Sequence, residues 1–217
     1  MTAPLTLHEL TGSPNSVKVR IGLGLKGLEY ERVPLQLDGY PGNRAKLVEV
    51  SGQPRAPVLV HGKTVVFDSS AILRYLDANF RDTAPLYSTD HATMGQIEEW
   101  ELWARTDLSR PVGTMYGQCF APSPDPEVCR QACAMIHEVT GEIESRLAES
   151  PYLVRDTPSG ADLATAPAIA LAMLPAAAAA SSPIAAVFHE HFHLGDGRDR
   201  TREWVGKLLA HDVAQPR

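Results

Sequence analysis

The chain has 217 residues, of which 44% are hydrophobic and 21% are charged, and 20 Lys+Arg against 26 Asp+Glu leave a formal net charge of -6. This balance excludes a protein whose main task is to bind a polyanion, because phosphate contacts require a basic excess. The apolar fraction is that of a globular protein and excludes wholesale disorder. The length suffices for one large domain or two small ones.

Cysteine content and the apolar stretches predict a compartment. Three cysteines are an odd number that does not make a disulfide framework, so they favour a reducing environment. The first nine residues (MTAPLTLHE) contain an acid and a histidine where a signal peptide needs a basic and then an apolar region. The longest apolar stretch, 161–187, is broken by three prolines, which argues against a membrane span. We therefore expect a cytoplasmic protein with neither membrane nor nucleic-acid partners.

The first eighty residues alternate between strand and helix patterns. Residues 5–10 alternate with period two and predict a strand that ends in a turn at 12–15. Val17, Ile21, Leu25 and Leu28, with Leu23 nearby, form a helical stripe over 16–28. The elements expected after it are a strand at 29–35, a loop at 38–43, a short helix at 44–50, strands at 57–60 and 64–67 around a hairpin turn, and a helix at 69–79. This order, β-α-β-α-β-β-α, predicts a mixed four-stranded sheet covered by helices.

Strand patterns stop after a polar, proline-containing linker at 81–90. The helical stretches expected beyond it are 92–116, 127–149, 161–174 and 200–211, with a short helical piece in the alanine run 176–180. We therefore predict an α/β domain at 1–80 and an all-α domain at 91–217.

Three local features of the first domain have both an ordinary and a functional interpretation. Ser13 and Ser16 stand at a strand end that opens a helix, where a hydroxyl ordinarily caps the helix. In the functional interpretation, the hydroxyl and the positive helix end together hold an anion such as a thiolate. Pro57 precedes an apolar strand, and a cis Ala56–Pro57 bond would turn the backbone of Ala56 toward an extended ligand.

The third feature is Asp68 followed by Ser69 and Ser70 at the start of a predicted helix. A serine at this position is ordinarily a helix cap. The same groups also suit a zwitterion, because the hydroxyl and helix N–H groups bind a carboxylate while Asp68 binds an ammonium group.

Taken in order, these segments resemble the cytosolic glutathione transferases. The resemblance rests on SPNSVKVRIGLGLKGLEY at 13–30, RAPVL at 55–59 and DSSAILRYL at 68–76. It implies a thioredoxin-like domain followed by an all-helical one, which lines the hydrophobic substrate site. In the second domain, Ser159-Gly160-Ala161-Asp162 resembles the helix-capping box of the family, a folding element with a hydroxyl at the N-cap and a carboxylate three residues later.

The resemblance also implies roles for individual residues. Ser13 stands at the position of the catalytic serine, as in the serine-type classes (tau, zeta and bacterial relatives). Arg55 would meet the glycyl carboxylate of glutathione, and Ala56, before a cis Pro57, would pair with the cysteinyl backbone. Asp68 and Ser69 would hold the γ-glutamyl end.

Some positions depart from the family pattern. The common Asn-Pro before the proline loop is Ser51-Gly52 here, and Asp68 replaces a glutamate. The basic residue that often assists glycyl binding falls at Asn43, with Arg44 as a substitute. These departures leave room for a non-catalytic binding protein of the same fold.

The resulting functional prediction is a homodimeric glutathione transferase that uses glutathione as cosubstrate, needs no metal and adds the thiol to a small hydrophobic electrophile, as in detoxification. A zeta-like cis-trans isomerase acting on maleylacetone or maleylpyruvate is the alternative enzyme. Residues that would line the electrophile site are Trp103, Asp107, Arg110, Met115 and Tyr116. A metal site at His189 and His193 is disfavoured, because no third ligand has a suitable spacing.

Overall fold

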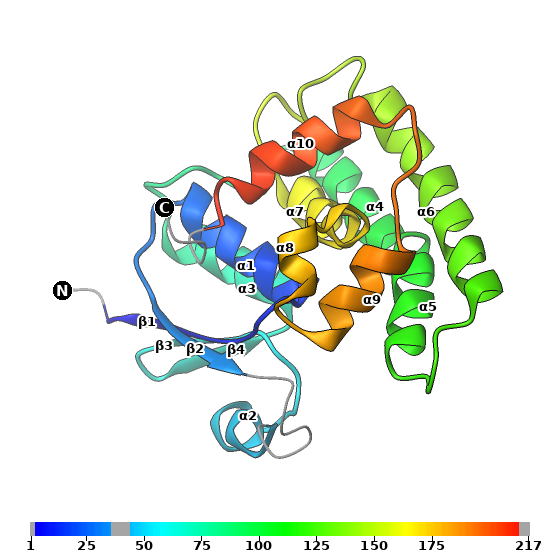
Figure 1. Ribbon diagram of the computed structural model, residues 1–217. Coiled ribbons are helices and arrows are strands. Elements are labelled where there is room, and N and C mark those ends of the chain that lie inside the picture. The colour runs from blue at the N-terminus through cyan, green and yellow to red at the C-terminus, as the bar shows by residue number, and fades with distance from the viewer. Residues whose placement is uncertain (1–2, 36–43, 213–217) are drawn as a thin grey trace. The chain divides into compact units, whose positions relative to one another are not determined.

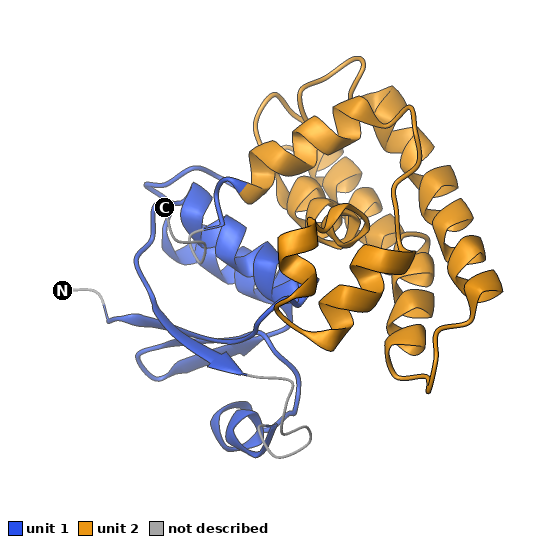
Figure 2. Cartoon of the chain, in the orientation of Figure 1, with its two compact units in different colours: residues 1–87, 210–217 blue, residues 88–209 orange. Residues whose placement is uncertain are grey.

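The computed structural model describes residues 3–35 and 44–212. These residues form two compact units (Figure 2): the first contains the described residues up to Tyr87 together with 210–212, and the second is Ser88–Leu209. The predicted second domain runs from 91 to 217, so the two divisions differ at the C-terminal end. The predicted loop at 38–43 lies outside the described residues.

The first unit contains a mixed four-stranded sheet in the order β2-β1-β3-β4. Strand β1 (Leu5–Leu10) pairs in parallel with β2 (Glu31–Leu35) and antiparallel with β3 (Val58–His61), which pairs with β4 (Thr64–Phe67). Helices α1 (Pro14–Leu25), α2 (Arg44–Ser51) and α3 (Ser69–Asn79) connect or follow these strands. The predicted order β-α-β-α-β-β-α is confirmed.

The sheet is covered on both faces (Figure 1), with α1 and α3 on one side and α2 on the other. On the α2 side the buried side chains of Leu35, Leu47 and Val58 form a small apolar cluster, against which Ala56 packs. The start of β3 is therefore held in place by packing against α2.

Helix α1 differs from its prediction in its bounds, and only part of the predicted stripe is fully buried. It begins at Pro14, where proline suits the first helical turn, and ends before Gly27, whose φ is 62°. The fully buried apolar residues are Val19, Ile21 and Leu23, whereas most of the predicted stripe is only partly buried. Beside these apolar residues, α1 also buries polar side chains that have partners on other elements.

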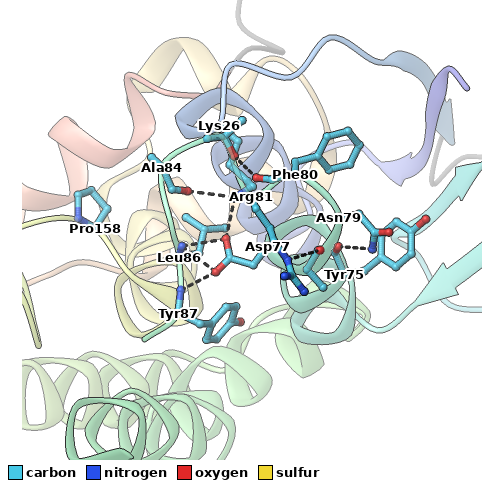
Figure 3. A network of polar contacts seen from close by, with 12 residues as sticks. Lys26, Tyr75, Asp77, Asn79, Phe80, Arg81, Ala84, Leu86, Tyr87 and Pro158 are labelled. Carbon is cyan, nitrogen blue, oxygen red and sulfur yellow. Dashed lines mark hydrogen bonds and ion pairs between the residues drawn. The ribbon is translucent and has the colours of Figure 1, made fainter. Parts of the chain in front are cut away.

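Two of the buried basic residues are Arg20 of α1 and Lys26 at its C-cap. Arg20 forms an ion pair with Glu9 of β1. It also forms a bidentate ion pair with Asp212, in which both N–O distances are 2.8 Å. Lys26 donates to Asp77 of α3 at 2.7 Å, and Asp77 also accepts the backbone N–H groups of Leu86 and Tyr87 (Figure 3). Buried charges are tolerated only when they are paired in this way.

The second unit is helical. Its elements are α4 (His91–Thr106), α5 (Ser109–Cys119), α6 (Pro126–Arg146), α7 (Gly160–Ile169), the 3-10 helix η1 (Ala170–Met173), α8 (Ala176–Ala179), α9 (Pro183–His191) and α10 (Asp199–Leu209). The single helix predicted at 92–116 was wrong: it is broken between Thr106 and Ser109. Pro111 explains the break, because proline lacks an N–H and its ring obstructs the preceding helical turn. No helix among the described residues is long and apolar enough to cross a membrane.

The Ser159–Asp162 box is a folding element. Asp162 is fully buried and accepts the N–H and hydroxyl of Ser159 at 2.9 and 2.8 Å. Its other oxygen accepts the N–H of Leu153 at 3.0 Å and the indole N–H of Trp204 at 3.1 Å. One carboxylate thus joins the start of α7 to the preceding loop and to α10.

Glu144 of α6 holds the start of α10 in a similar way. It accepts the backbone N–H and the hydroxyl of Thr201 at 2.9 and 2.8 Å and the N–H of Arg200 at 3.2 Å. Burial alone would raise the pKa of Glu144, but these hydrogen bonds from Thr201 and Arg200 lower it overall from its ordinary value of 4.5.

We expect Asp162→Ala to lower the free energy of unfolding by about 3 kcal/mol or more, because it leaves buried donors without acceptors. Urea unfolding followed by circular dichroism measures the loss. Asp156→Ala, which changes an exposed aspartate nearby, is the matched control and should stay within about 0.5 kcal/mol of the wild type. A loss of less than about 1 kcal/mol in Asp162→Ala would contradict the role given to the box.

We expect Glu144→Gln to cost about 1 kcal/mol of stability at pH 7. Because the folded-state pKa of Glu144 is lowered, its charged form stabilises the fold above the unfolded pKa of 4.5, and this contribution is lost as the pH falls further. Urea unfolding at pH 7 and at pH 3.5 should therefore show a deficit that is smaller at pH 3.5. A deficit of equal size at both pH values would argue against a charge effect, and Glu149→Gln on an exposed side chain is the control.

Candidate functional site

Ser13 lies directly before α1 and its hydroxyl is not used as a cap. The residue is the N-cap of α1 by position and its carbonyl accepts the N–H groups of Ser16 and Val17 at 3.0 Å, but its side chain makes no capping hydrogen bond. The hydroxyl of Ser16 has a different local role, since it accepts the N–H of Leu10 at 3.1 Å. The partly exposed Ser13 hydroxyl is thus left at the positive end of α1.

Asp68 occupies an uncommon backbone conformation at the start of α3, with φ 71° and ψ 124°. Its Oδ1 caps the helix by accepting the N–H groups of Ser70 and Ala71 at 2.9 and 3.0 Å. Strained residues of this kind cost about 1–3 kcal/mol and are frequent at ligand sites. Among the described residues, no hydrogen bond is made to the second oxygen, Oδ2.

The starts of α1 and α3 are joined by two side-chain contacts. The hydroxyl of Ser69 donates to Asn15 Oδ1 at 3.3 Å, and the buried Nζ of Lys18 donates to Ser70 Oγ at 2.6 Å. Sequence reasoning missed both partners on α1. Asn15 and Lys18 are three residues apart, so the spacing that places them on one helix face was the available signal.

The predicted proline loop enters β3. The Ala56–Pro57 peptide bond is cis, as the family resemblance implies. The side chain of Arg55 is exposed. Ala56 is partly buried against the apolar cluster on the α2 side of the sheet. Gln53, which sequence reasoning did not single out, contacts the backbone of Arg55.

Strand register brings these segments to one end of the sheet. Val58, the first residue of β3, lies opposite His8 near the end of β1 and opposite Phe67 at the end of β4. Three segments therefore emerge at the same end of the sheet: the loop from β1 to Ser13, the residues before Val58 and the residues after Phe67. Two helix N-termini meet there, and such ends favour anionic groups.

The other predicted site residues belong not to the loops described above but to α2, the residue before it and the second unit. Arg44 opens α2, whereas Asn43 lies outside the described residues. In the second unit, Met115 is fully buried and Tyr116 packs edge-on against Phe188 with ring centroids 4.9 Å apart. These two side chains have packing roles within their own unit, while Asp107 and Arg110 are exposed.

His189 and His193 do not form a pair of metal ligands on one helix face. The helix ends at His191, so His193 lies beyond it and not on the same helix face as His189. The His189 ring contacts the carbonyl of Leu174 at 2.8 Å, and the His193 ring contacts that of Glu190 at 3.0 Å. Within 3–35 and 44–212 there is no group of three or more His, Cys, Asp or Glu side chains placed to hold a metal ion.

The chain is similar to proteins of one family. Residues 7–84 match the family model described as glutathione S-transferase, N-terminal domain. Glutathione S-transferase 3 of Zea mays is 28% identical over 80% of this chain and 81% of its own length. A zeta class glutathione S-transferase of Euphorbia esula is 38% identical over 35% of this chain and 34% of its own. The crystal structure of poplar glutathione transferase F1 has a TM-score of 0.71 at 18% identity, covering 98% of this chain and 99% of that one, which supports the fold.

Proposed function

We infer that the chain belongs to the cytosolic glutathione transferase family, because residues 7–84 match the N-terminal domain model and a relative is 28% identical over 80% of the chain. We propose that it conjugates glutathione to a small hydrophobic electrophile, with Ser13 activating the thiol. The observation that carries the proposal is the convergence of three loops at one end of the sheet. Each loop brings one predicted binding element: Ser13, Ala56–Pro57, and Asp68–Ser69.

The chemistry follows from the pKa of a thiol. A free thiol with a pKa near 8.5 is only a few per cent thiolate at pH 7. Lowering that pKa by two units requires about 2.7 kcal/mol of preferential stabilisation of the thiolate. A hydrogen bond from the Ser13 hydroxyl to the sulfur and the positive end of α1 are suited to supply it. The thiol proton leaves to solvent, and the sulfur electron pair forms the new bond to the electrophile. In 1-chloro-2,4-dinitrobenzene the C–Cl bond breaks in turn, and chloride leaves with the bonding electron pair.

We propose that each loop binds one part of glutathione. Asp68 uses Oδ1 for the helix cap, so Oδ2 is suited to the γ-glutamyl ammonium group. Ser69 and the start of α3 are suited to the γ-glutamyl carboxylate. Arg55, with its exposed side chain, is suited to the glycyl carboxylate, and the backbone of Ala56 to the cysteinyl residue.

An isomerase remains the second candidate. The 38% identity to a zeta class relative favours it but covers only about a third of this chain. Isomerisation needs the same activated thiol, which adds to a cis double bond, permits rotation and leaves again. Maleylacetone offered alongside a conjugation substrate distinguishes the two reactions.

We expect Ser13→Ala to lower kcat/KM for conjugation of 1-chloro-2,4-dinitrobenzene by about 10- to 100-fold at pH 7, because one charge-assisted hydrogen bond is lost. Calorimetry at several pH values should show glutathione still bound but without the proton release of the wild type. Ser145→Ala removes an exposed hydroxyl on α6 and is the control. Wild-type protein that does not bind millimolar glutathione would refute both enzyme candidates and favour a non-catalytic binding protein.

We further propose a homodimer, as the family resemblance implies. The first unit exposes apolar side chains on neighbouring elements: Val65 and Phe67 alternate along β4, and Val48 lies on α2. Light scattering should give twice the 23.5 kDa chain mass for the wild type. Phe67→Asp should shift the equilibrium toward the monomer, while a wild-type monomer at micromolar concentration would contradict the proposal.

A further inference from the structure

The side-chain carboxamide of Gln53 binds both backbone groups of Arg55. Its Oε1 accepts the N–H of Arg55 at 2.7 Å, and its Nε2 donates to the carbonyl of Arg55 at 2.8 Å. The same Nε2 also donates to Ser51 Oγ at 3.0 Å. Ser51 Oγ in turn donates to the carbonyl of Leu47 at 2.7 Å. The carboxamide therefore connects the last turn of α2 to the loop before β3.

This contact fixes the direction of a neighbouring N–H group. The Arg55–Ala56 peptide bond is trans, and in a planar trans peptide the C=O and N–H point in opposite directions. Because the Arg55 carbonyl is held toward Gln53, the N–H of Ala56 is held away from it. Within the described part of the chain, no hydrogen bond is made to the backbone N–H or C=O of Ala56.

We propose that Gln53 is a positioning residue, which orients the Arg55–Ala56 peptide so that Ala56 N–H meets the cysteinyl backbone of glutathione. The inference rests on the proposed function. Gln53 touches neither the thiol nor any reacting atom, and acts only through the backbone of Arg55.

The turn before Gln53 explains why the usual Asn-Pro is replaced at this point. Gly52 has φ 73°, which proline cannot adopt because its ring fixes φ near −65°. The loop of this chain therefore requires a residue other than proline at position 52. The Ser51 hydroxyl and the Gln53 carboxamide together anchor the loop to α2.

The test compares Gln53→Met, which keeps the length of the side chain but removes its donors and acceptor, with the matched control Gln131→Met on the exposed face of α6. For Gln53→Met we expect KM for glutathione, measured with 1-chloro-2,4-dinitrobenzene, to rise about tenfold while kcat changes less than about twofold. The control should leave both constants unchanged. Amide exchange of Arg55, followed by NMR without glutathione, should be protected in the wild type and accelerated in Gln53→Met.

The outcomes separate this inference from the proposed function. If the wild type binds glutathione and Gln53→Met has the same KM, the positioning role is wrong. A fall in kcat and thermal stability with an unchanged KM would show a merely structural role and would also overturn it. If the wild type does not bind glutathione, the proposed function fails and the positioning role with it. Exchange of the Arg55 amide then tests the hydrogen bond between Gln53 and Arg55 independently of glutathione binding. Fast exchange in the wild type would refute that hydrogen bond.

Discussion

The hydrogen bonds of three buried cations, two on α1 and one at its C-cap, are the constraint on which the geometry of the first unit depends. Arg20 is held between Glu9 and Asp212, Lys18 donates to Ser70, and Lys26 donates to Asp77. Rotating α1 about its axis, or sliding it by one residue, would separate each cation from its partner and leave buried charges uncompensated. Such a separation is strongly destabilising, whereas the pairs themselves add little net stability. Their main effect is therefore to select one orientation of α1.

That orientation determines where the candidate chemistry lies. Ser13 precedes the first turn of α1, so the direction of the helix axis fixes the region that its hydroxyl reaches. Lys18 and Asn15 meet the two serines at the start of α3, so the positive ends of both helices face one region. The strand register adds the loop before Val58 at the same end of the sheet. The proposed binding elements are thus loops on a rigid support, which is the usual way to combine precise placement with variable side chains.

The local elements of the fold were predictable, whereas contacts between distant residues were not. Strands such as β1 and helices such as α3 were predicted from periodicity and capping residues, because these signals lie within a few residues. The burial of Arg20 on α1 was not predicted, since its acceptor is 192 residues away and a basic side chain in a helix ordinarily indicates an exposed face. The break before α5 was missed although Pro111 indicates it.

The candidate site shows the same division. The cis Ala56–Pro57 bond was predicted from the resemblance and is confirmed. Ser13 and Asp68 were named as candidates from spacing and resemblance, because each belongs to a short run of residues. Asn15 and Lys18 were missed, because their partners lie more than 50 residues further along the chain.

Gln53 illustrates a different reason for failure. Its partner Arg55 is only two residues away, but the contact requires the positive φ of Gly52 to turn the chain. A glutamine in a loop has no preferred structural role, so its sequence context carries no signal. What the proposed chemistry requires at this point is the direction of one backbone N–H, and several combinations of side chains are able to fix it. The departure at Ser51-Gly52 therefore does not by itself argue against glutathione binding, because the loop reaches a defined backbone geometry by other residues.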